Sequence, residues 1–442
     1  MERLLHYVWQ HRIYAYGSLH TTGGKPVEVI STGLHNNDAG PDFIDAKLKI
    51  GDELWAGNIE IHMSSSDWKR HRHDSDMAYD NVVLHVVDRD DCEVFTSKGR
   101  KVEQVVLHVP SYVEEHYNEL YRASSDMPCY RHAVELPAVT IGNWMDRLAT
   151  ERLEDKTRRI VDLAERLDGD WENALFVTLA RSFGFGINSE AFEEWGMHIP
   201  LMAAGKHRDD IFQIESLFLG QAGLLDEAVL PSVYRDEALH EGYFKKLQTE
   251  YAFLANKFSL QPMNGARWRF LRMRPQNFPH IRLAQLAHLY VSRQVSVSSI
   301  TGAETLDDAR RLFVTAVTPY WQTHYVFGST TTVSSKNLRE ASVDSLLINA
   351  VVPMLYAYGI HRCHMEYCDR ALQFLEQIKP ENNHIIRLWL TYGMPVKSAA
   401  DSQALIQLRK QYCDRKDCLR CRFGTEYLKT THVYHVLQEP KK

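Results

Sequence analysis

The chain has 442 residues, a formal net charge of −6 at pH 7, 44% hydrophobic residues and seven cysteines. The length exceeds what one hydrophobic core usually supports, so we expect two or more domains, while the negative charge argues against indiscriminate nucleic-acid binding. No apolar run approaches the ~20 residues of a membrane-spanning helix, so we expect no membrane contact. The odd cysteine count argues against a secreted disulfide framework, so we expect a cytoplasmic protein. The sequence does not indicate the oligomeric state.

Residues 1–125 predict a small α/β domain. The opening segment MERLLHYVWQHRIY has the pattern of an amphipathic helix and lacks the apolar stretch and cleavage site of a signal peptide. Alternating apolar residues then predict strands. These strands are KPVEVIS, FIDAKLKI, LWAGNIEIHM, NVVLHVV, CEVFTS and VEQVVLHV.

Two of these strands carry acidic residues in a pattern typical of a metal site. Asp42 precedes FIDAKLKI, and Glu60 and His62 lie two residues apart in LWAGNIEIHM, hence on the same strand face. If the strands form a hairpin, Asp42 joins that face. Two acids and a third polar group can hold a divalent ion for phosphodiester chemistry. We therefore predict that Asp42 and Glu60 bind Mg or Mn and that His62 positions a water, which makes all three catalytic.

Each of these residues has a structural alternative. Pro41-Asp42 is also a common turn former, and Asp45 is expected on the opposite, solvated face. Glu60 stands inside an apolar strand, so on a buried face it needs a metal, a partner or a proton. A solvated outer face of the sheet is the alternative.

Pro41-Asp42 and Glu60-Ile61-His62, followed by the helix-like SSSDWKRHRHDSD and the apolar NVVLHVV, resemble the PD-(D/E)xK nuclease core. The resemblance implies a restriction-endonuclease-like domain and a metal-dependent nuclease or related phosphodiesterase. His62 stands where that family carries Lys, and an imidazole lacks the fixed charge of an ammonium group. The alternative is therefore a non-catalytic nucleic-acid-binding or scaffold protein on a degenerate nuclease core.

The segment after Glu60 adds further polar residues. Ser66-Asp67 before a tryptophan is typical of a helix cap. His73 and Asp76 can share a helical face and suit metal binding, an oriented imidazole or a phosphate contact; we assign His73 to substrate binding. His85, inside an apolar strand, is expected to be a structural, hydrogen-bonded histidine.

Residues 126–442 predict a larger, mostly helical domain, so the expected fold class is α+β. Apolar residues recur there at three- and four-residue spacing. Examples are WMDRLATERLEDKTRRIVDLAERL, DWENALFVTLARSFGF, IRLAQLAHLYVSR and SVDSLLINAVVPMLYAYGI.

Residues 251–303 contain seven arginines and lysines and no acidic residue. Arg267, Arg269 and Arg272 alternate with aromatic residues such as Trp268 and Phe270, which suits phosphate contact and base stacking. We predict that these three arginines bind nucleic acid. The alternative is an arginine-lined interface that docks the acidic first domain, whose residues 1–110 carry twelve basic and seventeen acidic side chains.

Three cysteines lie close together near the end of the chain. Cys413, Cys418 and Cys421 resemble three ligands of a zinc or iron–sulfur site. Cys363, His364 and Cys368 could supply a fourth ligand. Free thiols in a reducing compartment are the alternative.

Several ordered blocks are together similar to a bacterial family, domain of unknown function 2851 (DUF2851). They are GPDFIDAKL, WAGNIEIH, SSDW, AYDNVVLHVV, RPQNFPHIRL, YWQTHY and YCDRKDCLRC. The resemblance implies a bacterial cytoplasmic protein and brings no activity, substrate or partner.

Overall fold

The computed structural model describes residues 1–14, 17, 19–36, 38–124 and 127–430. The chain divides into two compact units. Met1–Ile141 and Leu408–Lys442 form the first, here called the sheet unit, and Gly142–Gln407 form the helical unit. The α+β class expected from the sequence is confirmed. The C-terminal cysteine segment, which the sequence analysis assigned to the helical domain, belongs to the sheet unit because its helices pack there.

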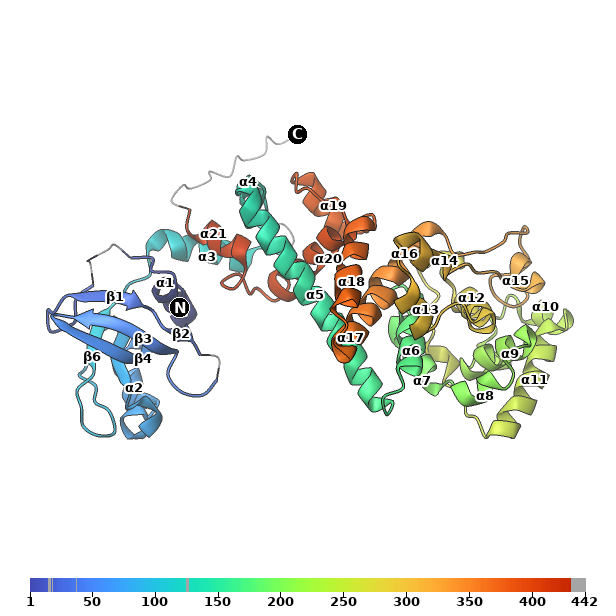
Figure 1. Ribbon diagram of the computed structural model, residues 1–442, viewed down its shortest axis with the longest axis horizontal. Coiled ribbons are helices and arrows are strands. Elements are labelled where there is room, and N and C mark those ends of the chain that lie inside the picture. Colours follow the sequence, from blue (N-terminus) through green and yellow to red (C-terminus); the bar gives the residue numbers. More distant parts are fainter. Residues whose placement is uncertain (15–16, 18, 37, 125–126, 431–442) are drawn as a thin grey trace. The chain divides into compact units, whose positions relative to one another are not determined.

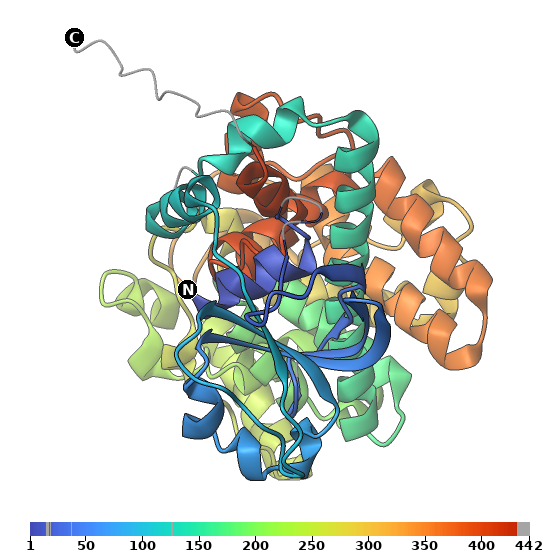
Figure 2. The same ribbon diagram turned by 90° about the vertical axis from the view of Figure 1, so that its left-hand side faces the viewer.

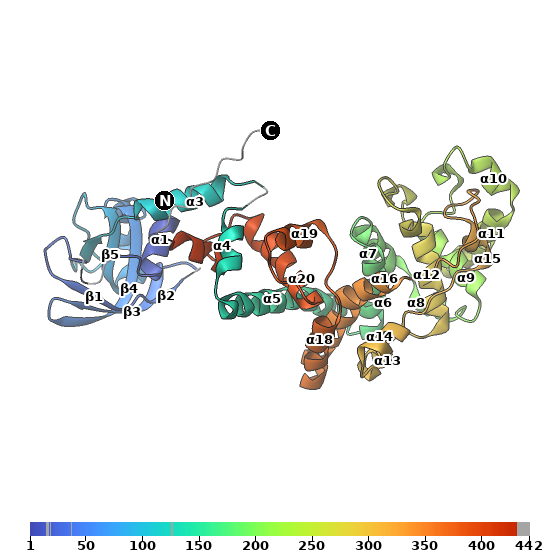
Figure 3. The same cartoon turned by 90° about the horizontal axis from the view of Figure 1, so that it is seen from above.

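The sheet unit is built on one six-stranded mixed sheet in the order β1-β3-β4-β5-β6, with β2 beside β3. The strands are β1 (Val27–Ser31), β2 (Leu34–His35), β3 (Phe43–Ile50), β4 (Glu53–Ser64), β5 (Val82–Arg89) and β6 (Glu103–Val106). β1, β3 and β4 are antiparallel neighbours, whereas β4, β5 and β6 run parallel. The predicted strand CEVFTS forms only an isolated bridge, Phe95 to Lys101. Helix α1 (Glu2–Gln10) packs against β4 (Figures 1 and 3).

The connection between β4 and β5 carries much of the site. Parallel strands need a crossover, which here consists of α2 (Asp67–Arg70) and the 3-10 turns η1 (His73–Ser75) and η2 (Met77–Tyr79), at one end of the sheet (Figure 2). The helix expected over this segment is therefore only one turn long. β4 approaches β5 closely at Gly57, where a Cβ would lie 2.4 Å from Val83 Cγ1.

Helices from both ends of the chain complete the sheet unit. They are α3 (Ser111–Arg122), α4 (Cys129–Glu135), the π-helix η7 (Leu408–Cys413) and α21 (Arg422–Leu428). α21 packs on α3 and α4. Tyr7 of α1 donates a hydrogen bond to the Thr425 carbonyl at 3.0 Å, and Tyr427 donates one to Glu119 at 2.6 Å. The last described residues are thus part of the core around α1.

The helical unit begins within α5 (Ala138–Arg166) and ends with α20 (Ala399–Gln407). Its other α-helices are α6 (Trp171–Phe183), α7 (Ser189–His198), α8 (Leu201–Gly205), α9 (Ile211–Gln221), α10 (Arg235–His240), α11 (Tyr243–Phe258), α12 (Pro279–Ser292), α13 (Val297–Gly302), α14 (Leu306–Arg311), α15 (Pro319–Thr323), α16 (Glu340–Leu346), α17 (Val352–Arg362), α18 (Met365–Gln377) and α19 (His384–Thr391). Short turns η3 (Glu227–Val229), η4 (Gly265–Arg267) and η5 (Pro275–Asn277) and the π-helical stretch η6 (Leu347–Val351) lie between them.

One continuous helical stretch, Glu340–Arg362, is long and apolar enough to cross a membrane, but 72% of its most apolar window is buried inside the protein. It comprises α16, η6 and α17. Its side chains Leu346, Leu347 and Leu355 are fully buried in the hydrophobic core of the helical unit. Packing of this kind is typical of a core helix.

Candidate metal centre

Asp42 and Glu60 lie side by side because β3 and β4 form a hairpin in which Phe43 pairs with Ile59. The Asp42 amide donates a hydrogen bond to Glu60 Oε2 at 3.1 Å. In return, the Ile61 amide donates one to Asp42 Oδ2 at 2.9 Å. These reciprocal bonds hold the two carboxylates next to each other. Asp45 instead is exposed, with a left-handed backbone at φ 56°.

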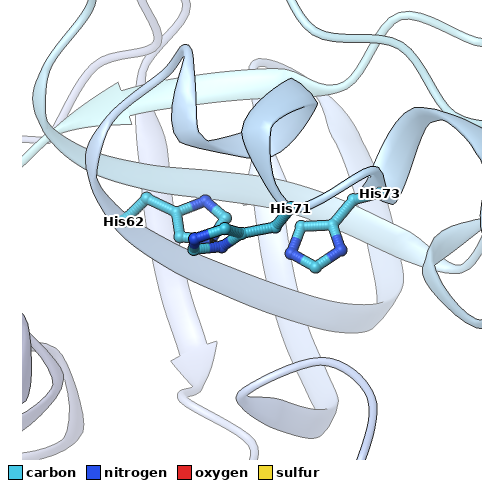
Figure 4. A group of neighbouring side chains, drawn as sticks. All are labelled: His62, His71 and His73. Atoms are coloured by element: carbon cyan, nitrogen blue, oxygen red, sulfur yellow. Dashed lines mark hydrogen bonds between the residues drawn. The ribbon is translucent and has the colours of Figure 1, made fainter.

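Three imidazoles converge on the same place. His62 lies on β4, and His71 and His73 flank Arg72 between α2 and η1 (Figure 4). One ring nitrogen from each of the three histidines lies within 4.8 Å of the other two. Arg72 has φ 63°, a left-handed turn that lets the chain present both neighbouring histidines to His62.

The carboxylate of Glu60 joins these imidazoles. Glu60 Oε1 lies 3.4 Å from His62 Nε2 and 3.3 Å from His73 Nε2, and His62 Nε2 lies 3.1 Å from His71 Nδ1. We call Asp42, Glu60, His62, His71 and His73 the histidine centre. Donors around a tetrahedral ion at ~2.0–2.1 Å lie ~3.3 Å from one another, so these three separations match such an ion.

Aromatic neighbours fix the orientation of His73. Its ring stacks on Tyr79 with centroids 3.7 Å apart and lies parallel to the ring of His62 at 5.3 Å. Trp68 meets it edge-on at 5.4 Å. His73 Nε2 is buried, and its polar contact is with Glu60 Oε1 at 3.3 Å, so the two atoms can share a proton or a metal ion.

A chain of hydrogen bonds sets the tautomer of His62. Gln104 donates its amide N–H groups to Asp90 Oδ1 at 2.9 Å and to the Cys92 carbonyl at 3.0 Å, which turns its Oε1 toward His85 Nδ1 at 3.1 Å. His85 therefore carries its proton on Nδ1 and accepts at Nε2 from His62 Nδ1, 2.9 Å away. The lone pair of His62 then lies on Nε2, the nitrogen that faces the histidine centre.

Burial controls the protonation of the centre. It lowers the pKa of His62 to about 2, an effect reinforced by the neighbouring histidines, and lowers the pKa of His85 to about 4. Burial also raises the pKa of Asp42 to about 6 and raises the pKa of Glu60, against the opposing effect of His73. A neutral His62 beside two carboxyls with raised pKa values forms a donor set that a cation would stabilise.

The structure places the other polar residues of this region elsewhere. Asp67 accepts a hydrogen bond from the Ser64 amide at 3.2 Å and pairs with Arg70 at 2.9 Å, which agrees with a local structural role. Asp76 caps η2 by accepting from Ala78. His73, assigned to substrate from the sequence, lies among the candidate ligands, and His71 joins it although the sequence analysis gave it no role.

The predicted substrate-binding arginines lie in the helical unit. Arg267 pairs with Glu194 of the same unit at 2.8 Å. Arg269 and Arg272 are exposed, and within the described residues their guanidinium groups have no hydrogen bond or ion pair. Trp268, expected to stack on bases, is 5% exposed and donates to the Ala222 carbonyl at 2.7 Å, so base stacking by this side chain is wrong: it is a core residue.

The C-terminal thiols are all buried in the sheet unit as free cysteines, at Cys413, Cys418 and Cys421. Cys363 and Cys368, proposed as sources of a fourth ligand, belong to the helical unit. Cys363 is exposed, and Cys368 donates to the Tyr356 carbonyl at 3.6 Å.

Comparison with known proteins identifies a family and nothing beyond it. A family model described as "Protein of unknown function (DUF2851)" matches residues 2–384. No curated protein and no solved structure matches the chain.

Proposed function

Since the chain belongs to the DUF2851 family, whose function is unknown, we propose from the histidine centre that the sheet unit is a metal-dependent phosphodiesterase acting on nucleic acid. The observation that carries this proposal is the reciprocal hydrogen bonding of Asp42 and Glu60 beside three imidazoles, two of them buried and one exposed. Such enzymes hold a metal ion with two carboxylates, one at the start of a strand and one inside the next strand, together with further donors.

Strand order supports a nuclease-like core. The strand after Asp42, the strand with Glu60 and His62, the short α2 and the apolar β5 come in the order expected from the PD-(D/E)xK resemblance, with α2 only one turn long. Asp42 stands before β3, and Glu60-Ile61-His62 lies on β4. The acidic residues therefore occupy the strands on which that resemblance would put them.

The donor set favours a transition metal. His62 Nε2, His71 Nδ1, His73 Nε2 and Glu60 Oε1 would hold the ion, with Asp42 alongside. Imidazole donors suit zinc or iron, whereas magnesium and manganese prefer oxygen donors. We therefore propose zinc or iron beside the Mg or Mn expected from the sequence. A bound divalent ion would act as a Lewis acid on a phosphoryl oxygen and make a water molecule more acidic.

His62 takes a different part from the lysine of the resembled family. With a pKa lowered to about 2 it is neutral at pH 7 and supplies no positive charge to a phosphate. Its Nε2 lone pair instead faces the other donors. Asp42 is the member of the histidine centre not assigned as a donor to the ion, and its Oδ2 lies 3.5 Å from His6 Nε2. We propose that this pair receives the proton of the attacking water.

A non-catalytic nucleic-acid-binding role is the second candidate. The observation that favours it is the absence of a lysine at position 62, together with the acidic character of residues 1–110. In that case the histidine centre would bind a metal for structural reasons and no bond would be cleaved.

Cleavage assays on the purified full chain separate the two candidates. DNA and RNA oligonucleotides are incubated with Zn²⁺, Fe²⁺, Mn²⁺ or Mg²⁺, and Glu60→Gln is compared with Glu53→Gln, an exposed carboxylate at the start of the same strand. Metal-dependent cleavage that falls at least ~100-fold in Glu60→Gln, but not in Glu53→Gln, supports the enzyme. Nucleic-acid binding without cleavage under every metal supports the second candidate, and equal cleavage in both variants contradicts the assigned site.

A further inference from the structure

A fourth buried thiol lies next to the three predicted from the sequence. Cys129 is the first residue of α4, and Cys421 caps α21, which packs against α4. The four thiols, at Cys129, Cys413, Cys418 and Cys421, are 5–8% exposed, and none forms a disulfide. All four belong to the sheet unit.

Side chains between the cysteines dock the C-terminal loop onto the segment that leads to Cys129. Lys416 lies between Cys413 and Cys418 with a left-handed backbone at φ 56°. Its ammonium group donates to the carbonyls of Leu120 and Ala123 and lies 3.8 Å from Met127 Sδ, two residues before Cys129. The loop is therefore anchored at the start of α4.

A second set of contacts holds Cys413 on the other side of Cys129. Arg409 donates to the hydroxyl of Tyr130, the neighbour of Cys129, at 3.3 Å. The hydroxyl of Tyr130 also forms a hydrogen bond with the sulfur of Cys413. Cys413 ends the π-helix η7, a local irregularity that is frequent at functional sites.

The thiols act on one another electrostatically and receive polar donors. Cys129 lies close enough to Cys421, Cys413 and Cys418 to interact with each of them electrostatically. The backbone amides of Gly424 and Phe423 donate hydrogen bonds to the sulfur of Cys421. Amide donors aimed at a buried sulfur stabilise a thiolate, the form that binds metals.

We infer that Cys129, Cys413, Cys418 and Cys421 together bind an iron–sulfur cluster. The last three follow the C-x4-C-x2-C spacing of plant-type ferredoxins, which take a fourth cysteine from a distant part of the chain. This centre is separate from the histidine centre and does not depend on the proposed phosphodiesterase activity.

The spacing of the sulfurs favours a cluster over a single zinc ion. Zinc–sulfur bonds of ~2.3 Å put tetrahedral thiolates ~3.8 Å apart. Among the described residues no three of these sulfurs lie within 4.8 Å of one another, so the close spacing of thiolates on a single zinc ion, one of the two metal sites expected from the sequence, is not present. A cluster fills a wider space because its irons and sulfides stand between the thiolates.

The cluster would join the two ends of the sheet unit. The chain leaves this unit after Ile141 and returns at Leu408. The ligand Cys129 precedes the helical unit in the chain, and the ligands Cys413 to Cys421 follow it. A single cluster would therefore close the chain segment between them into a loop. Closing a long loop of this kind restricts the unfolded chain and so stabilises the folded unit.

The test is analysis of the full chain purified without oxygen. Iron, acid-labile sulfide and zinc are measured per chain, with the visible absorption spectrum, for the wild type and for serine variants at each of the four cysteines. Cys363→Ser and Cys368→Ser, in the helical unit, are the matched controls. We expect a brown protein with iron and sulfide in equal amounts, lost in each of the four variants and retained in both controls.

Three results would overturn the inference. Zinc without sulfide would show that the thiolates hold a single ion, and neither iron nor zinc in the wild type would show that they hold none. Full iron and sulfide in Cys129→Ser would remove Cys129 from the ligands. Because the wild-type stoichiometry is measured directly, the inference is testable even if a variant fails to fold, which circular dichroism reveals.

Discussion

His62 Nδ1 donates to His85 Nε2 across 2.9 Å, so a histidine buried in the middle of β5 decides which nitrogen of His62 is free for a metal. His85 is 0% exposed and is not one of the proposed metal ligands. Its effect on the histidine centre passes through the tautomer of His62. Partners of this kind commonly change metal affinity ~10–100-fold when they are removed.

Changing Gln104 to leucine should therefore weaken metal binding although every proposed ligand is still present. Without the amide oxygen, His85 no longer has to hold its proton on Nδ1, and the preference of His62 for Nδ1–H is lost. We expect zinc affinity, measured by competition with a chelator, to fall ~10–100-fold. His108→Ala, an exposed histidine paired with Asp88 in the same unit, serves as the control. Unchanged zinc affinity in Gln104→Leu would contradict the tautomer argument.

Asp42→Asn should abolish metal-dependent cleavage, whereas Asp45→Asn should leave it near the wild-type rate. Asp42 lies against Glu60, while Asp45 is exposed and left-handed, a conformation that asparagine adopts readily. Each change removes one negative charge, and the two positions are three residues apart, so net charge cannot explain a difference in cleavage rate between the variants. A loss of at least ~100-fold is expected for Asp42→Asn alone. Equal rates in the two variants would exclude Asp42 from the site.

The buried carboxyl of Glu215 should make the helical unit less stable as the pH rises. Burial raises its pKa to about 7, opposed by hydrogen bonds from Tyr243 and Thr318. Because the pKa of Glu215 is higher in the folded than in the unfolded chain, its contribution to stability is complete below pH ~4.3. It is lost as the pH rises to about 7, roughly 4 kcal/mol in all.

Urea unfolding between pH 4.5 and 8 measures this effect. The difference in unfolding free energy between wild type and Glu215→Gln should change across that range, because glutamine does not titrate. Glu237→Gln, an exposed carboxyl of the same unit, should run parallel to the wild type. A constant difference between wild type and Glu215→Gln would show that the carboxyl does not change its charge in this range.

Arg269 and Arg272 should contribute more to nucleic-acid binding than Arg267. Arg267 is already paired with Glu194, whereas the other two are exposed and unpaired within the described residues. In a plot of log affinity against log salt, the slope should flatten by roughly one unit for each lost phosphate contact. We expect the slope to change more in Arg269→Ala and in Arg272→Ala, each made singly, than in Arg267→Ala. Identical slopes in all variants would exclude this arginine cluster as a nucleic-acid contact.

Strand periodicity was sufficient to predict where the two acids of the site meet. Alternation put Glu60 and His62 on one face of β4, and the Gly51-Asp52 turn fixed the hairpin that brings Asp42 beside them. Nothing in the spacing of His71 and His73 predicts their convergence. That depends on Arg72 adopting φ 63° and on α2 ending after one turn, both consequences of tertiary packing.

The fourth thiol was beyond the reach of local sequence patterns for a similar reason. Cys129 stands alone among hydrophobic and polar residues, so it carries no spacing signal, whereas Cys363 and Cys368 form a visible pair. Only the packing of α4 on α21 brings Cys129 to the C-terminal loop. For Trp268 the local pattern was misleading: its basic neighbours indicated a nucleic-acid-binding surface, but its ring lies in the core.

Gly424→Ala should disrupt the proposed cluster without touching a ligand. A Cβ at Gly424 would lie 2.4 Å from the backbone oxygen of Cys418, so the cysteine loop must move. We expect lower iron and sulfide content and a lower melting temperature. Gly142→Ala, a helical glycine whose Cβ would meet nothing within 4 Å, is the control and should raise stability by ~0.5–1 kcal/mol. Full iron and sulfide content in Gly424→Ala would show that this contact does not shape the cysteine loop.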